Sequence, residues 1–229
     1  MPYIHSKYSV ISPGTSQVSS LSTGNIIIPS VVDTLVLLQV TKPGTSVLAA
    51  TFNTSENFTF LAGVQHASGV RVDIGMLRRP TPTTAAVVTG ISSSWAGMVV
   101  LAIANSVPSL IQGTGYTGIA GGVGTSTTIS NSPISVSTDL VIDVLGYGNY
   151  ATVGAASVGA GQTQQFGLQI NSGGGANMLG FYVSTEVASG SSTTMSWTTS
   201  VNAEFAHEAI AFKDAKFDAV GQGRITHAP

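Results

Sequence analysis

The side chains that could carry out acid–base or metal chemistry are few and scattered. The four histidines show no His-x-x-x-His or similar metal-binding spacing: His5, His66, His207 and His227. His207 and Glu208 are adjacent, but neighbouring residues on a strand point to opposite faces of a sheet. The chain has no Gly-x-Ser-x-Gly turn and no cysteine, which excludes a serine-hydrolase elbow, a thiolate nucleophile and a disulfide. We therefore predict that the protein is not an enzyme and has no catalytic or cofactor-binding residue.

Two aspartates and a glycine-rich segment are the remaining candidates for ligand binding. Asp139 and Asp143 are four residues apart on an expected strand, where they can share a face and hold Ca²⁺ with loop carbonyls. Aspartates at strand ends more often cap turns, so we predict no metal site and keep Ca²⁺ as the alternative. The segment Gly113–Gly118 matches a dinucleotide-binding pattern, but the glycine-rich sequence after it does not favour the helix that this pattern requires.

The charge of the chain is unusually low. Asp, Glu, Lys and Arg make up 8% of the residues, against about 25% in ordinary globular domains. The net charge of −2 gives no overall attraction to nucleic acid or acidic lipid. The longest apolar run, residues 95–104, is half as long as the roughly twenty residues of a membrane-spanning helix. We predict neither nucleic acid nor a membrane as a partner. A neutral, hydroxyl-rich surface instead suits packing against other copies, since no charge has to be desolvated.

The local pattern is that of β-structure throughout. Short segments rich in Val, Ile, Thr and Ala alternate with Gly, Ser, Asn and Pro, which predicts strands separated by turns. The expected strands are 24–28, 34–41, 46–52, 57–63, 69–77, 85–91, 96–104, 125–129, 139–146, 163–169, 177–184, 193–201 and 206–212. This pattern predicts an all-β fold, specifically a two-sheet antiparallel sandwich of jelly-roll type.

An internal repeat indicates how the sandwich is built. When the sequence is aligned with itself at an offset of 110, Thr89 matches Thr199 and Trp95 matches Phe205. At an offset of 105, the segment 35–37 matches the segment 140–142. The matches predict two similar Greek-key halves, residues 33–105 and 139–213. We expect Trp95 and Phe205 to occupy equivalent buried corners, with Trp197 as a further core anchor.

The remaining segments complete the expected domain organisation. Residues 1–23 are predicted to form an N-terminal arm, and residues 24–212 the β-sandwich. A Gly/Ser-rich loop, residues 106–138, joins the two halves. Charge returns near the C-terminus, so residues 213–229 are predicted to form a C-terminal arm.

Several segments resemble a lectin-like, jelly-roll β-sandwich module that recurs in phage virion proteins and bacterial surface proteins. The segments are DLVIDVLGYG (139–148), the turn Gly159-Ala160-Gly161-Gln162-Thr163, TMSWTTSVNAEFAHEAIAF (194–212) and SSSWAGMVVLAIA (92–104). The resemblance covers residues 33–213, and the turn and the Trp197 hairpin are its most specific parts. It implies a jelly-roll fold and no shared catalytic residues.

The leading functional hypothesis is a virion protein of a bacteriophage: a capsid, decoration or tail component that assembles in many copies. The N-terminal sequence has no secretory signal, so we expect synthesis in the host cytoplasm and a place in the virion with copies of itself and other virion proteins. The candidate subunit contacts are Arg78, Arg79, Lys213, Asp214, Lys216, Phe217, Asp218, Val220, Arg224 and Ile225.

The alternative hypothesis is a carbohydrate-binding or adhesive module of a cell-surface or tail-fibre protein. Exposed aromatic rings would then stack on a glycan, and the candidate platform is formed by Tyr116, Tyr147 and Tyr150. The sequence does not distinguish a capsid from a tail or decoration role, and it names no host, symmetry or glycan.

Overall fold

The computed structural model describes residues 1–12, 17–42, 49–66, 69–106, 116–121, 127–149, 155–170, 178–199 and 204–213. Within these stretches the chain forms strands and no helix, and the named strands pair antiparallel. The predicted all-β fold with antiparallel sheets is therefore confirmed. The division of the strands into layers differs from the prediction. The first half of the chain forms one nine-stranded sheet that a long shared strand divides into two layers, and the second half forms a five-stranded and a three-stranded sheet.

The first unit, residues 3–104, contains strands β1 to β9. Their bounds are β1 (Tyr3–Ile11), β2 (Val18–Ile28), β3 (Val32–Lys42), β4 (Ala49–Phe52), β5 (Glu56–Asn57), β6 (Thr59–Phe60), β7 (Val64–Gln65), β8 (Arg71–Arg78) and β9 (Thr83–Ala104). These strands form one nine-stranded sheet with two layers, which we call its inner and outer sheets. The inner sheet has the order β1-β9-β3-β8-β6, with β7 also on β8, and the outer sheet places β2 and β4 on β9, with β5 on β4. The long strand β9 belongs to both sheets, because residues 83–94 pair in the outer sheet and residues 95–104 in the inner sheet.

The second unit, residues 116–212, contains strands β10 to β17. Their bounds are β10 (Tyr116–Gly121), β11 (Thr127–Asn131), β12 (Leu140–Asn149), β13 (Ala156–Val158), β14 (Thr163–Ile170), β15 (Met178–Val187), β16 (Met195–Thr199) and β17 (Glu204–Phe212). Its inner sheet has the order β10-β17-β12-β15-β14, and its outer sheet the order β11-β16-β13. The strand order matches that of the first unit, with β16 and β17 in the places of the two parts of β9.

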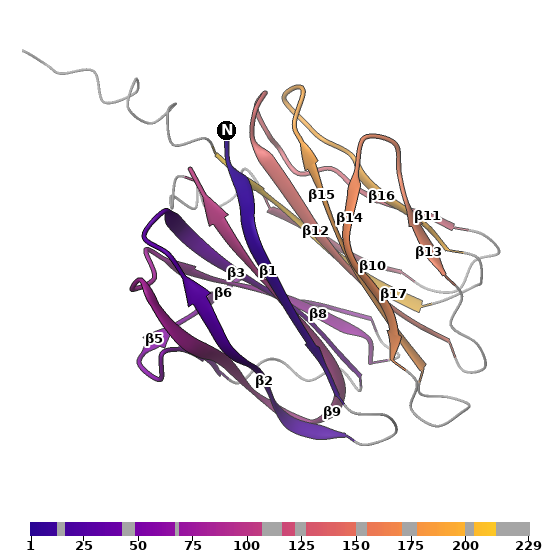
Figure 1. Cartoon of the computed structure of the whole chain (residues 1–229). Helices are drawn as coiled ribbons and strands as arrows, with labels where there is room; N and C mark the ends of the chain where they lie inside the picture. The colour runs from indigo at the N-terminus through magenta and orange to yellow at the C-terminus, as the bar shows by residue number, and fades with distance from the viewer. Residues whose placement is uncertain are drawn as a thin grey trace, which may run out of the picture.

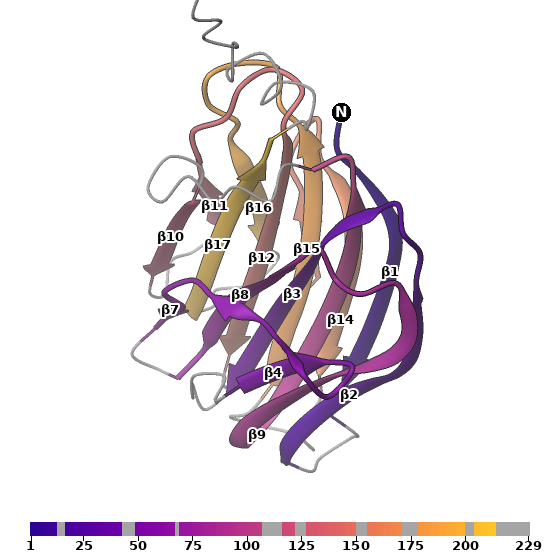
Figure 2. The same ribbon diagram turned by 90° about the vertical axis from the view of Figure 1, so that its left-hand side faces the viewer.

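The two inner sheets pack face to face, so the molecule has four layers (Figure 1; Figure 2). The largest apolar cluster lies between the inner sheets and combines side chains of β3, β8 and β9 with side chains of β12, β15 and β17. Strands β3 and β12 run in the same direction, because a Cβ on Gly146, late in β12, would meet Val40, late in β3. Equivalent loops of the two units therefore lie at the same end of the molecule.

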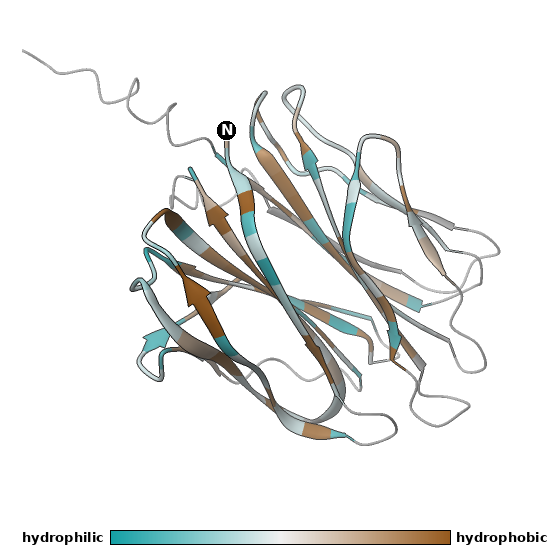
Figure 3. Ribbon diagram, in the orientation of Figure 1, coloured by the Kyte–Doolittle hydropathy of each residue, from teal (hydrophilic) through white to brown (hydrophobic). Residues whose placement is uncertain are grey.

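Alternation along the central strands places apolar side chains on both faces of each inner sheet. Val36 and Leu38 of β3 enter the cluster between the units, while Leu35 and Leu37 enter the core of the first unit. Strands buried on both faces require near-continuous apolar sequence, which explains why residues 35–38 lack the alternation of a half-exposed strand. Figure 3 shows this hydrophobic colour along the central strands and more hydrophilic colour at β5 and β14.

The predicted arm and linker are wrong. Residues 1–23 include β1, which pairs with β9 along the inner sheet, and the first part of β2. The expected loop 106–138 includes β10 and β11, which pair with β17 and β16. The sequence did not predict these strands because edge strands are half exposed and carry many polar residues. For example, β1 alternates between exposed and partly buried positions over most of its length.

The repeat is present in the order of strands, but its predicted residue matches fail in the central strands. Leu35 faces the core of its own unit, whereas its predicted match Leu140 faces the cluster between the units. Likewise Trp95 packs against the cluster between the units, and Phe205 packs against the core of the second unit. Both rings are partly exposed, so they do not occupy equivalent buried corners. Trp197 is fully buried, as predicted.

Candidate functional site

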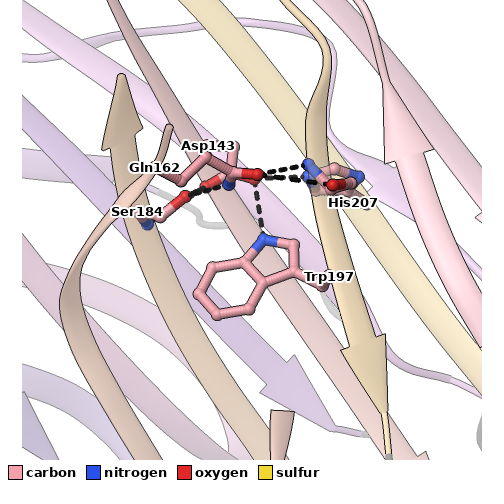
Figure 4. A network of polar contacts seen from close by, with 6 residues as sticks. Asp143, Gln162, Ser184, Trp197 and His207 are labelled. Atoms are coloured by element: carbon pink, nitrogen blue, oxygen red, sulfur yellow. Dashed lines mark hydrogen bonds and ion pairs between the residues drawn. The ribbon is translucent and has the colours of Figure 1, made fainter. Parts of the chain in front are cut away.

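Five polar or aromatic side chains of the second unit meet at one buried point (Figure 4). Three of them project from neighbouring strands of the inner sheet, one from the outer sheet, and one from the turn that precedes β14: Asp143 of β12, Ser184 of β15, His207 of β17, Trp197 of β16 and Gln162. Asp143, Ser184, Trp197 and His207 are 0% exposed. The five residues therefore connect the two sheets of the unit through its interior. We call them the Asp143 cluster.

The carboxylate of Asp143 accepts four hydrogen bonds. Its Oδ1 accepts from the backbone N–H of Ser184 at 3.0 Å and from the Ser184 hydroxyl at 2.5 Å. Its Oδ2 accepts from Nε1 of Trp197 at 2.7 Å and from Nε2 of His207 at 2.8 Å. Four donors and no acceptor is the arrangement that suits an ionised carboxylate, which can only accept. Such charge-assisted hydrogen bonds are stronger than neutral ones.

Gln162 connects the turn before β14 to this cluster. Its Nε2 donates to the Ser184 hydroxyl at 2.6 Å, and its Oε1 accepts from the backbone N–H of Ser196 at 2.7 Å. Gly161 in the same turn has φ = +87°, a left-handed conformation that glycine adopts without strain. The turn singled out in the sequence thus has a structural role: it brings an amide side chain to the Asp143 cluster.

The cluster contains the residue types of a Ser-His-Asp triad but not its arrangement. In a triad the histidine lies between the serine and the aspartate and takes the serine proton. Here Asp143 lies between Ser184 and His207, and the Ser184 hydroxyl donates to the carboxylate. These three side chains are also fully buried, so a substrate has no access to them. The geometry supports a structural role, in which the cluster fixes how the strands of the second unit pack.

The first unit buries a different polar pair on the corresponding strands. Gln39 of β3 lies opposite Asp73 of β8, as Asp143 of β12 lies opposite Ser184 of β15. The Arg71 guanidinium binds the Asp73 carboxylate at 2.7 and 3.0 Å. Each unit thus carries buried polar groups between its central strands, with different chemistry in each.

Charges near the cluster and between the units have shifted pKa values. Burial raises the pKa of Glu186 in β15, and the negative charge of Asp143 raises it further. Burial lowers the pKa of Lys42 at the end of β3, an effect that nearby Glu204 at the start of β17 opposes. Lys42 belongs to the first unit and Glu204 to the second, so this pair of opposite charges lies where the two units meet.

The two aspartates considered for Ca²⁺ have separate environments. The Asp143 carboxylate already accepts the four hydrogen bonds described above. The Asp139 carboxylate accepts from the backbone N–H of Val136 at 2.9 Å, which caps the loop before β12. In the part of the chain that the structure describes, no group of three or more His, Cys, Asp or Glu side chains is arranged to hold a metal ion. Capping, the commoner role of a strand-end aspartate, is what the structure shows for Asp139.

The expected glycan platform is not formed as predicted. Tyr147 is fully buried, and its ring stacks on Tyr182 with centroids 5.5 Å apart. Burial raises the pKa of the Tyr147 hydroxyl. The prediction that Tyr147 is an exposed platform is therefore wrong, because the strand turns this ring into the core of the second unit. The backbone of Tyr116 begins β10, and Tyr150 lies outside the described residues.

Arg78 and Arg79 lie at the end of β8 and are exposed. Beside Arg78 is an open hollow of about 350 Å³ whose described lining is Asn57, Thr59, Met76 and Arg78. Lys213 follows β17, whose last residue Phe212 shares the cluster between the units with Met76. The other expected arm contacts lie outside the described residues: Asp214, Lys216, Phe217, Asp218, Val220, Arg224 and Ile225.

Exposed apolar side chains gather at the end of the molecule where β3 and β12 begin, which we call the β3/β12 end. Of nine large exposed hydrophobic side chains among the described residues, seven lie there: Met1, Tyr3, Ile27, Val31, Ile134, Val136 and Val187. Val31 precedes β3, and Ile134 and Val136 lie in the corresponding loop before β12. Both units therefore contribute to this surface, which the sequence did not predict because it depends on the parallel packing of the units.

Comparison of the chain with protein-family models, with curated proteins and with solved structures finds no match. Among the described residues, no helix is long and apolar enough to cross a membrane. The functional argument therefore depends on the chain's own geometry.

Proposed function

We propose that the protein is a non-enzymatic structural component of a bacteriophage virion, a capsid, decoration or tail protein that assembles in many copies. The observation that carries this proposal is the β3/β12 end, where seven exposed apolar side chains of both units are concentrated. Clustered apolar exposure marks interaction surfaces, whereas single exposed apolar residues are ordinary.

The strand pairing of the second unit adds support, because we infer a jelly-roll topology from it. The first and last strands of the second unit are neighbours in the inner sheet, β10 beside β17, and the next strands inward are neighbours in the outer sheet, β11 beside β16. Pairing of early strands with late strands in this way is expected of a jelly roll, a fold frequent in viral shells. The low charge fits contacts between copies, since little charge would be desolvated.

A glycan-binding module is the second hypothesis, and one observation bears on it. An open hollow with a polar rim, lined by Asn57, Thr59 and Arg78, offers hydrogen-bond donors and acceptors to a sugar. The loss of Tyr147 as a stacking platform weakens this alternative, because aromatic stacking was its main basis.

Sedimentation velocity and electron microscopy of the purified chain test the proposal. We expect species larger than the 23.2 kDa monomer, with closed oligomers or lattices in the micrographs. Val31→Ser and Ile134→Ser at the β3/β12 end should each reduce the assembled fraction. The matched controls Val88→Ser and Leu168→Ser remove exposed apolar side chains elsewhere and should leave assembly unchanged.

The virion assignment has its own direct test. Phage particles purified from the strain that encodes the chain should contain it in many copies by quantitative mass spectrometry. A chain that is monomeric at its highest soluble concentration, and that is missing from the particles, would refute the proposal.

A further inference from the structure

The hollow beside Arg78 has the features of a receptor for one apolar side chain next to an acidic group. Its described lining combines the buried thioether chain of Met76 with the exposed Asn57, Thr59 and Arg78. Thr59 and Met76 lie opposite each other on β6 and β8, so the hollow extends back along β8 from the Arg78 guanidinium. The volume of about 350 Å³ is at the small end of the range for specific binding sites.

The positive charge at the rim has no partner in the described structure. Neither Arg78 nor Arg79 forms an ion pair with another described residue, and both side chains are exposed. Residues 80–138 contain no charged side chain, and neither do residues 144–185. A carboxylate for these guanidinium groups therefore has few sources within the chain.

The C-terminal segment supplies an aromatic ring and carboxylates within a sequence of mixed charge. Phe217 lies between Lys216 and Asp218, and Asp214 comes three residues before it. The described chain reaches Lys213 directly after Phe212, which packs in the same cluster as Met76. Sixteen residues follow, enough to span about 50 Å when extended. The segment thus starts near the hollow and is long enough to reach the same hollow on a neighbouring molecule.

We propose that the hollow lined by Asn57, Thr59, Met76 and Arg78 binds the C-terminal segment of a second copy, with Phe217 in the hollow and its flanking aspartates against Arg78 and Arg79. This inference rests on the proposed function, because it gives a second contact by which copies join, in addition to the β3/β12 end. We assign the donor to a neighbour because residues 213–220 contain no Gly, Pro, Asn or Ser to reverse the chain, and Asp214 and Asp218 are the turn-favouring residues among them. Reaching its own hollow would require such a reversal, since the hollow lies back along β8.

Each contact is individually weak, which is suited to reversible assembly. Exposed Arg–Asp pairs contribute about 0–1 kcal/mol each and weaken with salt. Burial of a Phe side chain contributes about 1.5–3 kcal/mol. A single arm therefore gives a low affinity, and a closed ring or lattice gains its stability from many arms at once.

Engineered cysteines test the contact cleanly, because the chain has no cysteine of its own. We would prepare the full-length variants Thr59→Cys and Phe217→Cys, mix them under mild oxidation and separate the products on a non-reducing gel. The proposal predicts a disulfide-linked dimer of one copy of each. Adding Arg78→Ser and Arg79→Ser to the Thr59→Cys partner, or raising the salt concentration, should slow dimer formation several-fold. Ser157→Cys, exposed in β13, is the matched control for Thr59→Cys and should give no dimer with Phe217→Cys.

Three outcomes would overturn the inference, and they are distinguishable. An intramolecular disulfide in the double variant Thr59→Cys/Phe217→Cys, without a dimer from the mixed single variants, would show that a chain binds its own segment. Absence of any disulfide while the unmodified chain still forms large species in sedimentation would overturn this contact and leave the proposed function standing. An unmodified chain that is monomeric at its highest soluble concentration, gives no mixed dimer and is missing from phage particles would overturn both.

Discussion

Replacing Asp143 with Asn tests whether the Asp143 cluster holds the second unit together. The substitution keeps the shape of the side chain but replaces one carboxylate oxygen with an NH₂ group. Oδ1 and Oδ2 each accept two hydrogen bonds, so either orientation of the amide turns its NH₂ group toward at least one group that can only donate. With the amide oxygen toward Ser184, that group is Nε1 of Trp197. With the opposite orientation, it is the backbone N–H of Ser184, whose hydroxyl can turn to accept.

The expected loss of stability follows from that donor. A buried donor without a partner costs about 1–3 kcal/mol. The loss of the charge from the remaining hydrogen bonds acts in the same direction. Native proteins have a total stability of about 5–15 kcal/mol, so Asp143→Asn should remove a large part of it.

Urea unfolding followed by tryptophan fluorescence measures the effect, because Trp197 donates to Asp143 and reports on the site directly. Asp33→Asn is the matched control. The Asp33 carboxylate accepts one hydrogen bond, from the backbone N–H of Ser106 at 3.2 Å, and an Asn oxygen can replace it. We expect the control to cost less than about 1 kcal/mol. If Asp143→Asn also costs less than that, the cluster relaxes or admits water, and the assignment of a structural role to it is refuted.

Three further substitutions test other parts of the structure. Gly146→Ala should destabilise the fold by about 1–3 kcal/mol, because its Cβ would lie 2.6 Å from Val40 between the two units; Gly190→Ala, with nothing within 4 Å, should be near neutral in the same urea assay. Thr138→Gly should raise the melting temperature, since Thr138 holds φ = +82° at a cost of about 1–2 kcal/mol; an equal or lower melting temperature would contradict this. The raised pKa of Glu186 means that the folded state retains a proton that the unfolded state releases, so stability falls as pH rises above 4.5 toward the raised value. Glu186→Gln should therefore flatten that part of the pH–stability curve, and an unchanged slope would refute the assignment.

The sequence predicts the strands well where both faces are buried. Residues 35–38 and 140–142 are apolar without interruption, and both lie on the central strand of an inner sheet. It fails at β1, β10 and β11, whose polar residues are consistent with an arm or a loop. These edge strands are fixed by backbone pairing with β9, β17 and β16, and such pairing leaves little trace in side-chain pattern.

The candidate site was visible only in part. The segments that carried the resemblance contain Asp143, Gln162, Trp197 and His207, but their spacing does not show that four strands and a turn converge on one carboxylate. Nothing in the sequence indicated that Ser184 belongs to the Asp143 cluster, because serines are common throughout this Gly- and Ser-rich chain. A buried Asp in an otherwise apolar strand was the one available indication, since an isolated buried charge requires partners from elsewhere in the fold.

The parallel packing of the two units explains why contacts gather at one end. A single unit would offer one loop before its central strand, with Val31 as its exposed apolar side chain. Because β3 and β12 run the same way, the second unit adds Ile134 and Val136 at the same end. Antiparallel packing would have divided these loops between opposite ends and halved the apolar surface at each. The duplicated unit thus produces, within one chain, a contact surface of the kind that two associated copies would otherwise be needed to form.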